Sequence, residues 1–280
     1  MKITRYSAYK KQNILTIFKE IFQEFPKANA LGYRLAVRNI KAKYRQSMFG
    51  LFWALLPPLA TSIIWIFLRG QGVVEFEETG VAYPVFVVAG TFIWQMFSLS
   101  INLPMQTVKA NKSILTKINF PRESLFYSSL YEIGFNILLS FIVVIVAMVY
   151  FGAFPGIEGL LFIPLLLLLL IMGLAISLII MPIATLYSDI QFALPTFLQF
   201  LMYLTPVIYP QPLYTGFGKI LEFNPISPLL TATRNFLLGI PNEIGSEILI
   251  GLGIGIIILF LIGILLMRLT MEILIERMGS

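Results

Sequence analysis

The feature that most constrains this chain is a set of six uncharged stretches, each at least 20 residues long. They run over 46–68, 79–108, 133–157, 159–188, 190–218 and 248–267. About 20 apolar residues in a helix are enough to cross the hydrocarbon core of a bilayer. We therefore expect an all-α integral membrane protein with six transmembrane helices, at about 48–68, 83–103, 125–151, 160–186, 192–210 and 247–267. Its hydrophobic content of 58% and its mean hydropathy of +0.86 fit that class.

The distribution of Lys and Arg predicts the orientation of these helices. Seventeen basic residues precede the first span, lie in the loop 109–123 or follow the last span, whereas the other side carries Arg69, Lys219 and Arg234. The positive-inside rule then places both termini in the cytoplasm. The chain divides into interfacial amphipathic helices at 1–46, a transmembrane domain at 47–268 and a cytoplasmic tail at 269–280, and we expect a multi-pass protein of the plasma membrane.

The segment before the first span has the spacing of two amphipathic helices. Apolar residues recur at helical intervals over 13–25, and Pro26 is expected to end that helix. A second helix has one apolar face, formed by Tyr33, Val37, Ile40 and Tyr44, and one basic face, formed by Arg34, Arg38, Lys41 and Arg45. Such a helix lies in the membrane surface with its basic side among anionic headgroups. The four basic residues could equally serve only to orient the chain in the membrane and to bind headgroups in general.

Two loops have more apolar content than simple connectors. In Lys109–Glu123, the side chains of Ile114, Leu115 and Ile118 would share one face of a short helix that Pro121 ends. That face either docks a cytoplasmic protein or rests on the membrane. The outer segment 211–246 is too apolar for a solvated loop and too short to span, so we expect a re-entrant or interfacial helix pair there.

The composition excludes several kinds of chemistry. The chain has no His and no Cys, and no G-x-x-x-x-G-K-[ST] phosphate-binding loop. Glu132 is the one clear ionisable residue within the expected spans, which disfavours ion-coupled transport. We therefore expect no catalytic residues and no metal or cofactor site. We also expect no nucleic-acid partner, because the basic residues behind the net charge of +6 are explained by the orientation of the chain in the membrane.

Polar side chains, all uncharged except Glu132, instead form stripes along three spans. Span two carries Thr91, Gln95, Ser98, Asn102 and Gln106 on one face, span three carries Ser128, Glu132, Asn136 and Ser140, and span five carries Thr196, Gln199 and Tyr203. Such groups need another helix or water, because lipid leaves them without hydrogen bonds. Span three fits interhelical hydrogen bonding at least as well as a pathway. For span two the length of the stripe favours a polar pathway, with Trp94 and Tyr203 as candidates for stacking on sugar rings.

Seven short motifs follow one another along the chain. They are KYRQSMFGLFWALLPP at 43–58, YPVFVVAGTFIW at 83–94, NKSILTKINFP at 111–121, YSDI at 187–190, YLTPVIY at 203–209, NPISP at 224–228 and Arg234. Together they resemble the membrane subunit of ABC-2-type polysaccharide exporters, the permeases for O-antigen, capsular polysaccharide and teichoic acid. Two positions depart from the usual pattern: Ser188 stands where an Arg commonly precedes the Asp, and Thr205 where a Ser commonly precedes Pro-Val.

The resemblance implies a bacterial inner-membrane homodimer with two copies of a separate ATPase subunit that binds ATP and Mg. It implies that a coupling helix sits in a groove of that ATPase, with Ile114, Leu115, Lys117, Ile118, Asn119 and Phe120 at the contact. It further implies a channel between the two copies, for a glycan on an undecaprenyl-diphosphate-type lipid. The expected lining is Thr91, Trp94, Gln95, Ser98, Asn102, Gln199 and Tyr203, and the lipid diphosphate would be attracted by Arg34, Arg38, Lys41 and Arg45. The alternatives are an ABC-2 permease for a small lipid or drug, a membrane enzyme acting on lipid-linked sugars, and a passive channel.

Overall fold

A computed structural model describes residues 14–45, 47–75, 79–111, 121, 123–210 and 223–279, and within these ranges the side chains from 23 to 270. Every element in that part of the chain is helical, as predicted. The elements are α1 (Ile14–Tyr44), α2 (Phe52–Gly70), α3 (Tyr83–Ala110), α5 (Glu123–Phe151), the short 3₁₀ helix η1 (Ile157–Leu161), α6 (Phe162–Leu186), α7 (Ser188–Leu204), α8 (Ile226–Leu238) and α9 (Ser246–Gly279).

Five helices in the described ranges are long and apolar enough to cross a membrane. They are α2, α3, α5, the unit Ile157–Leu186 and Ser246–Thr270 of α9. These five correspond to the predicted spans one, two, three, four and six. The chain is therefore a multi-pass membrane protein.

The predicted fifth span, 192–210, differs from the helix at that place. The helix α7 begins at Ser188 and ends at Leu204, so with 17 residues it is shorter than the five candidate spans. It ends there because a residue before proline is pushed out of the helical region, and Thr205, which precedes Pro206, has φ −109° and ψ 141°. Residues 205–210 belong to no helix.

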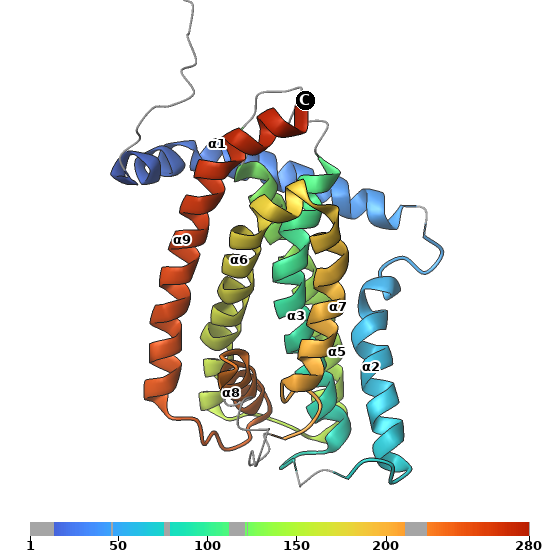
Figure 1. Cartoon of the computed structure of the whole chain (residues 1–280). Coiled ribbons are helices and arrows are strands. Elements are labelled where there is room, and N and C mark those ends of the chain that lie inside the picture. The colour runs from blue at the N-terminus through green and yellow to red at the C-terminus, as the bar shows by residue number, and fades with distance from the viewer. Residues whose placement is uncertain are drawn as a thin grey trace, which may run out of the picture.

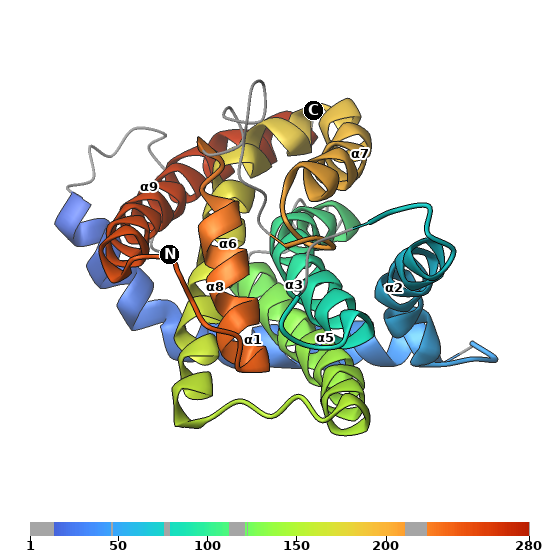
Figure 2. The same ribbon diagram turned by 90° about the horizontal axis from the view of Figure 1, so that it is seen from below.

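The long helices surround α3, which is the most buried of them (Figure 1). Residues on all sides of α3 are buried, because it packs against α2, α5, α6, α7 and α8. Seen along the bundle, α2 lies at the edge and its outer side has no neighbour in this chain (Figure 2). The short helix α8 lies at the end of the bundle opposite α1, against α6 and α3, and the predicted partner helix falls partly on residues 211–222, outside the described ranges.

The helix α1 lies across one end of the bundle and corrects one prediction (Figure 1). It is a single helix that contains Pro26, so the expectation that Pro26 ends a first helix is wrong. An interior proline removes one hydrogen bond from a helix. Contacts with α5 occur on both sides of Pro26, where the Phe25 ring lies 5.4 Å from that of Tyr127 and the Tyr33 ring 5.4 Å from that of Tyr131.

The face of α1 that packs on the bundle is formed by small residues that the sequence analysis did not single out. Ala28, Gly32 and Ala36 face the bundle, whereas Tyr33 is 55% exposed. A Cβ atom on Gly32 would lie 2.6 Å from the Cβ atom of Tyr127 and 2.9 Å from the backbone oxygen of Ser124. Small residues thus let α1 approach the backbone of α5 closely, and the larger apolar side chains lie along the edges of the contact.

The segments predicted to be cytoplasmic gather at the α1 end. Arg268 of α9 forms ion pairs with Glu24 of α1 at 3.7 Å and with Glu123 of α5 at 3.3 Å. The first half of α1, the start of α5 and the end of the membrane-spanning part of α9 are therefore joined there, as the predicted topology requires. The basic residues identify this end as the one expected to face the cytoplasm.

Candidate functional site

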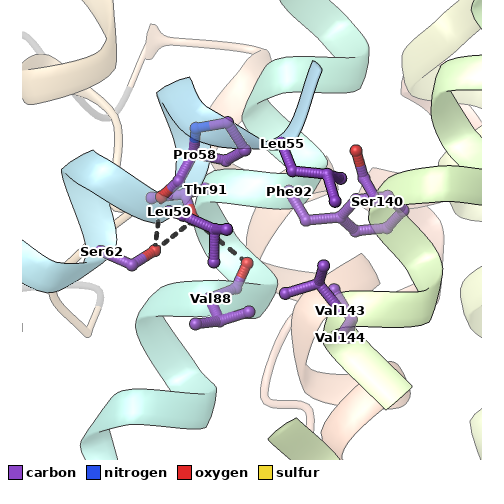
Figure 3. Close-up of a pocket in the computed structure, with 10 residues that line it drawn as sticks. All are labelled: Leu55, Pro58, Leu59, Ser62, Val88, Thr91, Phe92, Ser140, Val143 and Val144. Atoms are coloured by element: carbon purple, nitrogen blue, oxygen red, sulfur yellow. Dashed lines mark hydrogen bonds between the residues drawn. The ribbon is translucent and has the colours of Figure 1, made fainter. Parts of the chain in front are cut away.

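The outer part of the polar stripe on α3, Thr91 and Gln95, faces α2. The Ser62 Oγ and Thr91 Oγ1 atoms lie 2.9 Å apart (Figure 3). Gln95 Nε2 donates to the backbone oxygen of Ala54 at 3.2 Å. The crevice beside Ser62 and Thr91, between α2, α3 and α5, has a volume of about 10 Å³. That is about the space of one water molecule and far too small for a sugar ring. In this part of the stripe, the side chains hold two helices of one chain together.

The part of the stripe nearer the α1 end of the bundle reaches the surface of the chain. Asn102 Nδ2 donates to the backbone oxygen of Ser98 at 2.9 Å and lies 3.3 Å from Ser98 Oγ, and both residues are partly exposed. Gln106, one turn further on, is exposed. These hydrogen bonds stay within α3, so the polar surface is open toward whatever lies beside the bundle.

The helices α2 and α7 flank this part of α3 (Figure 2). On α7, Gln199 is exposed and Tyr203 is 44% exposed. The ring of Tyr203 lies 6.3 Å from the ring of Trp65 on α2, measured between centroids. Ser98, Asn102, Gln199, Tyr203 and Trp65 together form what we call the polar face.

The other candidate aromatic residue lies elsewhere. Trp94 is 5% exposed, and its ring centroid is 5.5 Å from that of Phe97. Within one chain it belongs to the apolar core around α3, so its ring has no open face for stacking on a sugar. Trp65 of α2, whose ring lies 6.3 Å from that of Tyr203, has the position that Trp94 was expected to have.

The four predicted lipid-diphosphate residues of α1 are all exposed. Arg38 differs from the rest because its guanidinium group donates to Asn39 Oδ1 at 3.0 Å and to Asn111 Oδ1 at 3.1 Å. Asn39 Nδ2 in turn donates to Glu132 Oε1 at 2.8 Å. This set of residues joins α1 to α5 and to the end of α3, and we call it the cytoplasmic junction.

Glu132 therefore has a role in packing, because its Oε1 atom accepts a second hydrogen bond from Ser128 Oγ at 3.3 Å. Its negative charge acts on Tyr44 of α1 as well. Burial first, and the charge of Glu132 second, raise the pKa of Tyr44 above its ordinary value. A raised pKa keeps this phenol neutral at physiological pH, where even an ordinary tyrosine is protonated.

The predicted ATPase contact lies outside the described residues. Ile114, Leu115, Lys117, Ile118, Asn119 and Phe120 all fall within 112–120. The described residues next to this loop contact other helices: Asn111 is 4% exposed and hydrogen-bonded to Arg38, and Glu123 pairs with Arg268. Among the residues that the structure describes, no group of His, Cys, Asp or Glu could hold a metal ion.

One polar cluster has no counterpart in the sequence-based site. Arg234 of α8 is 1% exposed and donates through Nη1 to the backbone oxygens of Pro206, at 2.6 Å, and Val207, at 3.1 Å. The sequence contained a usable signal, because a charged residue in an apolar segment of a membrane protein needs a specific partner.

A bundle of membrane-length helices with one open polar face defines the class of membrane transport subunits. The family described as ABC-2 type transporter matches residues 32–238, so this chain belongs to that family, and the predicted resemblance is confirmed. An O-antigen export system permease protein RfbA of Klebsiella pneumoniae is 26% identical over 203 residues, covering 72% of this chain and 77% of that protein. A protein of the same name from Myxococcus xanthus is 26% identical over 222 residues, covering 78% of this chain and 83% of the relative.

Proposed function

We propose that this chain is the permease subunit of an ATP-driven exporter that moves a lipid-linked polysaccharide of the O-antigen type outward across the bacterial inner membrane. The observation that carries the proposal is the polar face, which combines amide and hydroxyl groups with two aromatic rings. Relatives that are named as O-antigen export permeases support the same substrate class. A sugar polymer offers the hydroxyl groups and the flat apolar ring faces that such a surface binds.

The polar face also supports a homodimer. Gln199 and Asn102 would lose hydrogen bonds to water if this surface met lipid hydrocarbon. A second copy that covers the outer side of α2 would instead enclose the polar face between two chains, as a path filled with water and substrate. Only Ala54 and Ser62 of α2 are buried in one chain, which leaves most of this helix available for such a contact.

Energy for export would come from two copies of a separate ATPase, which would hold ATP and Mg. The loop 112–120 carries the proposed docking residues, with Ile114 and Ile118 on its apolar face. Movement of that loop would reach the bundle through its two neighbours in sequence, since Asn111 ends α3 and Glu123 begins α5.

The substrate lipid would meet the chain at α1. Arg34, Lys41 and Arg45 are exposed at the end of the bundle that we assign to the cytoplasm. Guanidinium and ammonium groups at headgroup level attract an anionic diphosphate. Arg38 would contribute charge to the same surface while it holds Asn111.

The central test replaces the two aromatic rings of the polar face. Trp65→Ala combined with Tyr203→Ala should reduce polysaccharide at the cell surface by on the order of tenfold, the factor that about 1.4 kcal/mol of lost interaction gives. The ATPase should still copurify with the variant. Tyr150→Ala is the matched control, because Tyr150 is an 81% exposed tyrosine at the end of α5, away from this face.

Two outcomes would count against the proposal. Normal export by the Trp65→Ala/Tyr203→Ala variant would mean that the path lies elsewhere. Normal surface polysaccharide in a strain that lacks the chain altogether, with loss of resistance to a small lipid or drug, would support the alternative substrate class.

For the docking loop, Ile114→Asp with Ile118→Asp should abolish copurification of the ATPase.

A further inference from the structure

The chain between α7 and the outer loop is non-helical and buried. Thr205, Pro206, Val207 and Ile208 are all buried, and Tyr209 is partly so. We call residues 205–209 the strap. A helix satisfies its own backbone groups, but an irregular segment at membrane depth needs partners from elsewhere in the protein.

Side chains from two other helices supply these partners. Arg234 Nη1 donates to the backbone oxygens of Pro206 and Val207, and the Tyr83 hydroxyl donates to that of Ile208 at 3.0 Å. Three consecutive carbonyl groups of the strap thus accept hydrogen bonds from α8 and α3.

Arg234 is a charged group without an acidic partner in the described part of the chain. Its guanidinium carbon lies 3.8 Å from the centroid of the Phe86 ring, so the ring face and the two carbonyl dipoles compensate for the water that burial removes. Its Nε atom has no hydrogen-bond partner within the described residues. Burying an arginine in this way is costly, and what it holds in place is the strap.

The strap also lies directly on the backbone of α3. A Cβ atom on Gly90 would overlap the backbone oxygen of Val207 and would come within 3.6 Å of Arg234 Nη1. Only a residue without a side chain allows this approach. At this point α3, α8 and the strap meet, and we call this the outer junction.

The strap in turn holds the end of α7. The Tyr209 hydroxyl donates to the backbone oxygen of Tyr203 at 3.0 Å, and Thr205 Oγ1 donates to that of Leu201 at 2.8 Å. Along its own length α7 buries only Leu198 and Met202. The position of its last turn, which presents Tyr203 to Trp65, therefore depends on the strap.

We infer that Arg234 is a positioning residue that sets the separation of α7 from α2 at the outer end of the polar face. It acts through the carbonyl groups of Pro206 and Val207 and touches no residue of the polar face itself. Its importance for export depends on the proposed function, whereas the separation of the two helices can be measured without any transport.

The experiment uses the absence of cysteine from the chain. Trp65→Cys with Tyr203→Cys introduces one reporter pair between α2 and α7, whose native rings lie 6.3 Å apart. A second pair, Tyr33→Cys with Tyr131→Cys, reports on the distant contact of α1 with α5, where the rings lie 5.4 Å apart. Cross-linking by a short bismaleimide is measured for each pair in membranes that contain the full complex.

With Arg234 present, both pairs should cross-link. Adding Arg234→Leu should lower the yield of the 65–203 pair several-fold and leave the 33–131 pair unchanged. An unchanged 65–203 yield alongside a normal 33–131 yield would overturn the inference. If Arg234→Leu abolishes both yields because the chain does not fold, Arg234→Lys decides, since it keeps the charge but lacks the planar group that lies over Phe86. A selective fall of the 65–203 yield supports the inference, and no fall overturns it.

The cross-linking result and the export result can be separated. Loss of the 65–203 cross-link with normal surface polysaccharide would leave the positioning role intact and would count against the polar face as the export path. An unchanged cross-link with reduced export in Arg234→Leu would overturn the positioning role and leave the proposed function in place.

Discussion

The two ends of the bundle are held together by different kinds of contact. At the outer junction, Arg234 and Gly90 fix the strap in a fully buried site where three backbone carbonyl groups depend on side-chain donors. At the cytoplasmic junction, Arg38 and Asn39 make comparable hydrogen bonds on a surface that is partly open to water.

This difference has a mechanical consequence. A group at the outer junction cannot exchange its partner for water, so movement there leaves a buried donor or acceptor unpaired at about 1–3 kcal/mol each. At the cytoplasmic junction water can replace a lost partner. We therefore expect the outer junction to move as a unit. At the cytoplasmic junction, which adjoins the loop that is proposed to dock the ATPase, we expect the helices to shift by exchanging hydrogen-bond partners for water.

The largest expected effect comes from Gly90→Ala. The added Cβ meets the backbone oxygen of Val207, which can yield only if the strap leaves α3. We expect a loss of roughly 3 kcal/mol or more, at the upper end of overpacking costs, and little folded protein in size-exclusion profiles. Gly134→Ala on α5 is the control, because nothing lies within 4 Å of its added Cβ. Similar profiles for the two variants would contradict the close contact.

Gly32→Ala makes the same change at the cytoplasmic end. Its Cβ atom would lie 2.6 Å from Tyr127 Cβ and 2.9 Å from the Ser124 oxygen. Since α1 lies on the surface of the bundle, it can shift outward, so we expect a cost of about 1–3 kcal/mol. The chain should remain folded in detergent while α1 becomes accessible to protease. Loss of the whole fold would show that α1 is as tightly held as the strap.

The regular parts of the molecule could be predicted because their signals are local. Length and hydropathy within a window are enough to identify α2, α3, α5, α6 and α9. The outer end of α7 could not be placed, although Pro206 marks where the helix stops. The helix can end at a buried position because Arg234 donates hydrogen bonds to the backbone carbonyl groups that follow it. Arg234 lies 28 residues further along the chain than Pro206.

The packing faces were harder to predict than the helices themselves. Helical spacing on α1 assigned Tyr33 to a side that faces the membrane. It did not reveal that Ala28, Gly32 and Ala36 make the contact with α5, which they do because they let two backbones approach. On α3 the stripe was correctly placed on one side, but helical spacing alone could not say that Thr91 meets Ser62 of another helix. Such outcomes depend on neighbours that are distant in sequence.

Asn39→Leu should have a smaller effect than either glycine change. It removes the 2.8 Å hydrogen bond to Glu132 Oε1 and leaves Ser128 as the remaining side-chain donor to that atom. We expect a loss of about 1.5 kcal/mol, the lower end for a hydrogen bond to a charged group, because Ser128 still donates to that oxygen. Adding Glu132→Leu should recover most of it, since removing both partners can be nearly neutral. A double-mutant cycle of thermal stability in detergent measures the coupling, and purely additive losses would contradict it.

Arg38→Ala should lower stability less than the changes above, and its comparison with Arg34→Ala separates the two roles of the basic face of α1. Arg38 is exposed, so loss of its bond to Asn111 should cost about 1 kcal/mol, the net contribution of one hydrogen bond. Arg34→Ala should leave stability unchanged, because no hydrogen bond or ion pair of Arg34 occurs within the described residues. Both changes should weaken binding to vesicles that contain an anionic lipid diphosphate. The difference from the unchanged chain should become smaller as salt is added, because salt screens exposed charges. If Arg38→Ala lowered stability and left vesicle binding unchanged, Arg38 would act only within the cytoplasmic junction, and the lipid site would be limited to Arg34, Lys41 and Arg45.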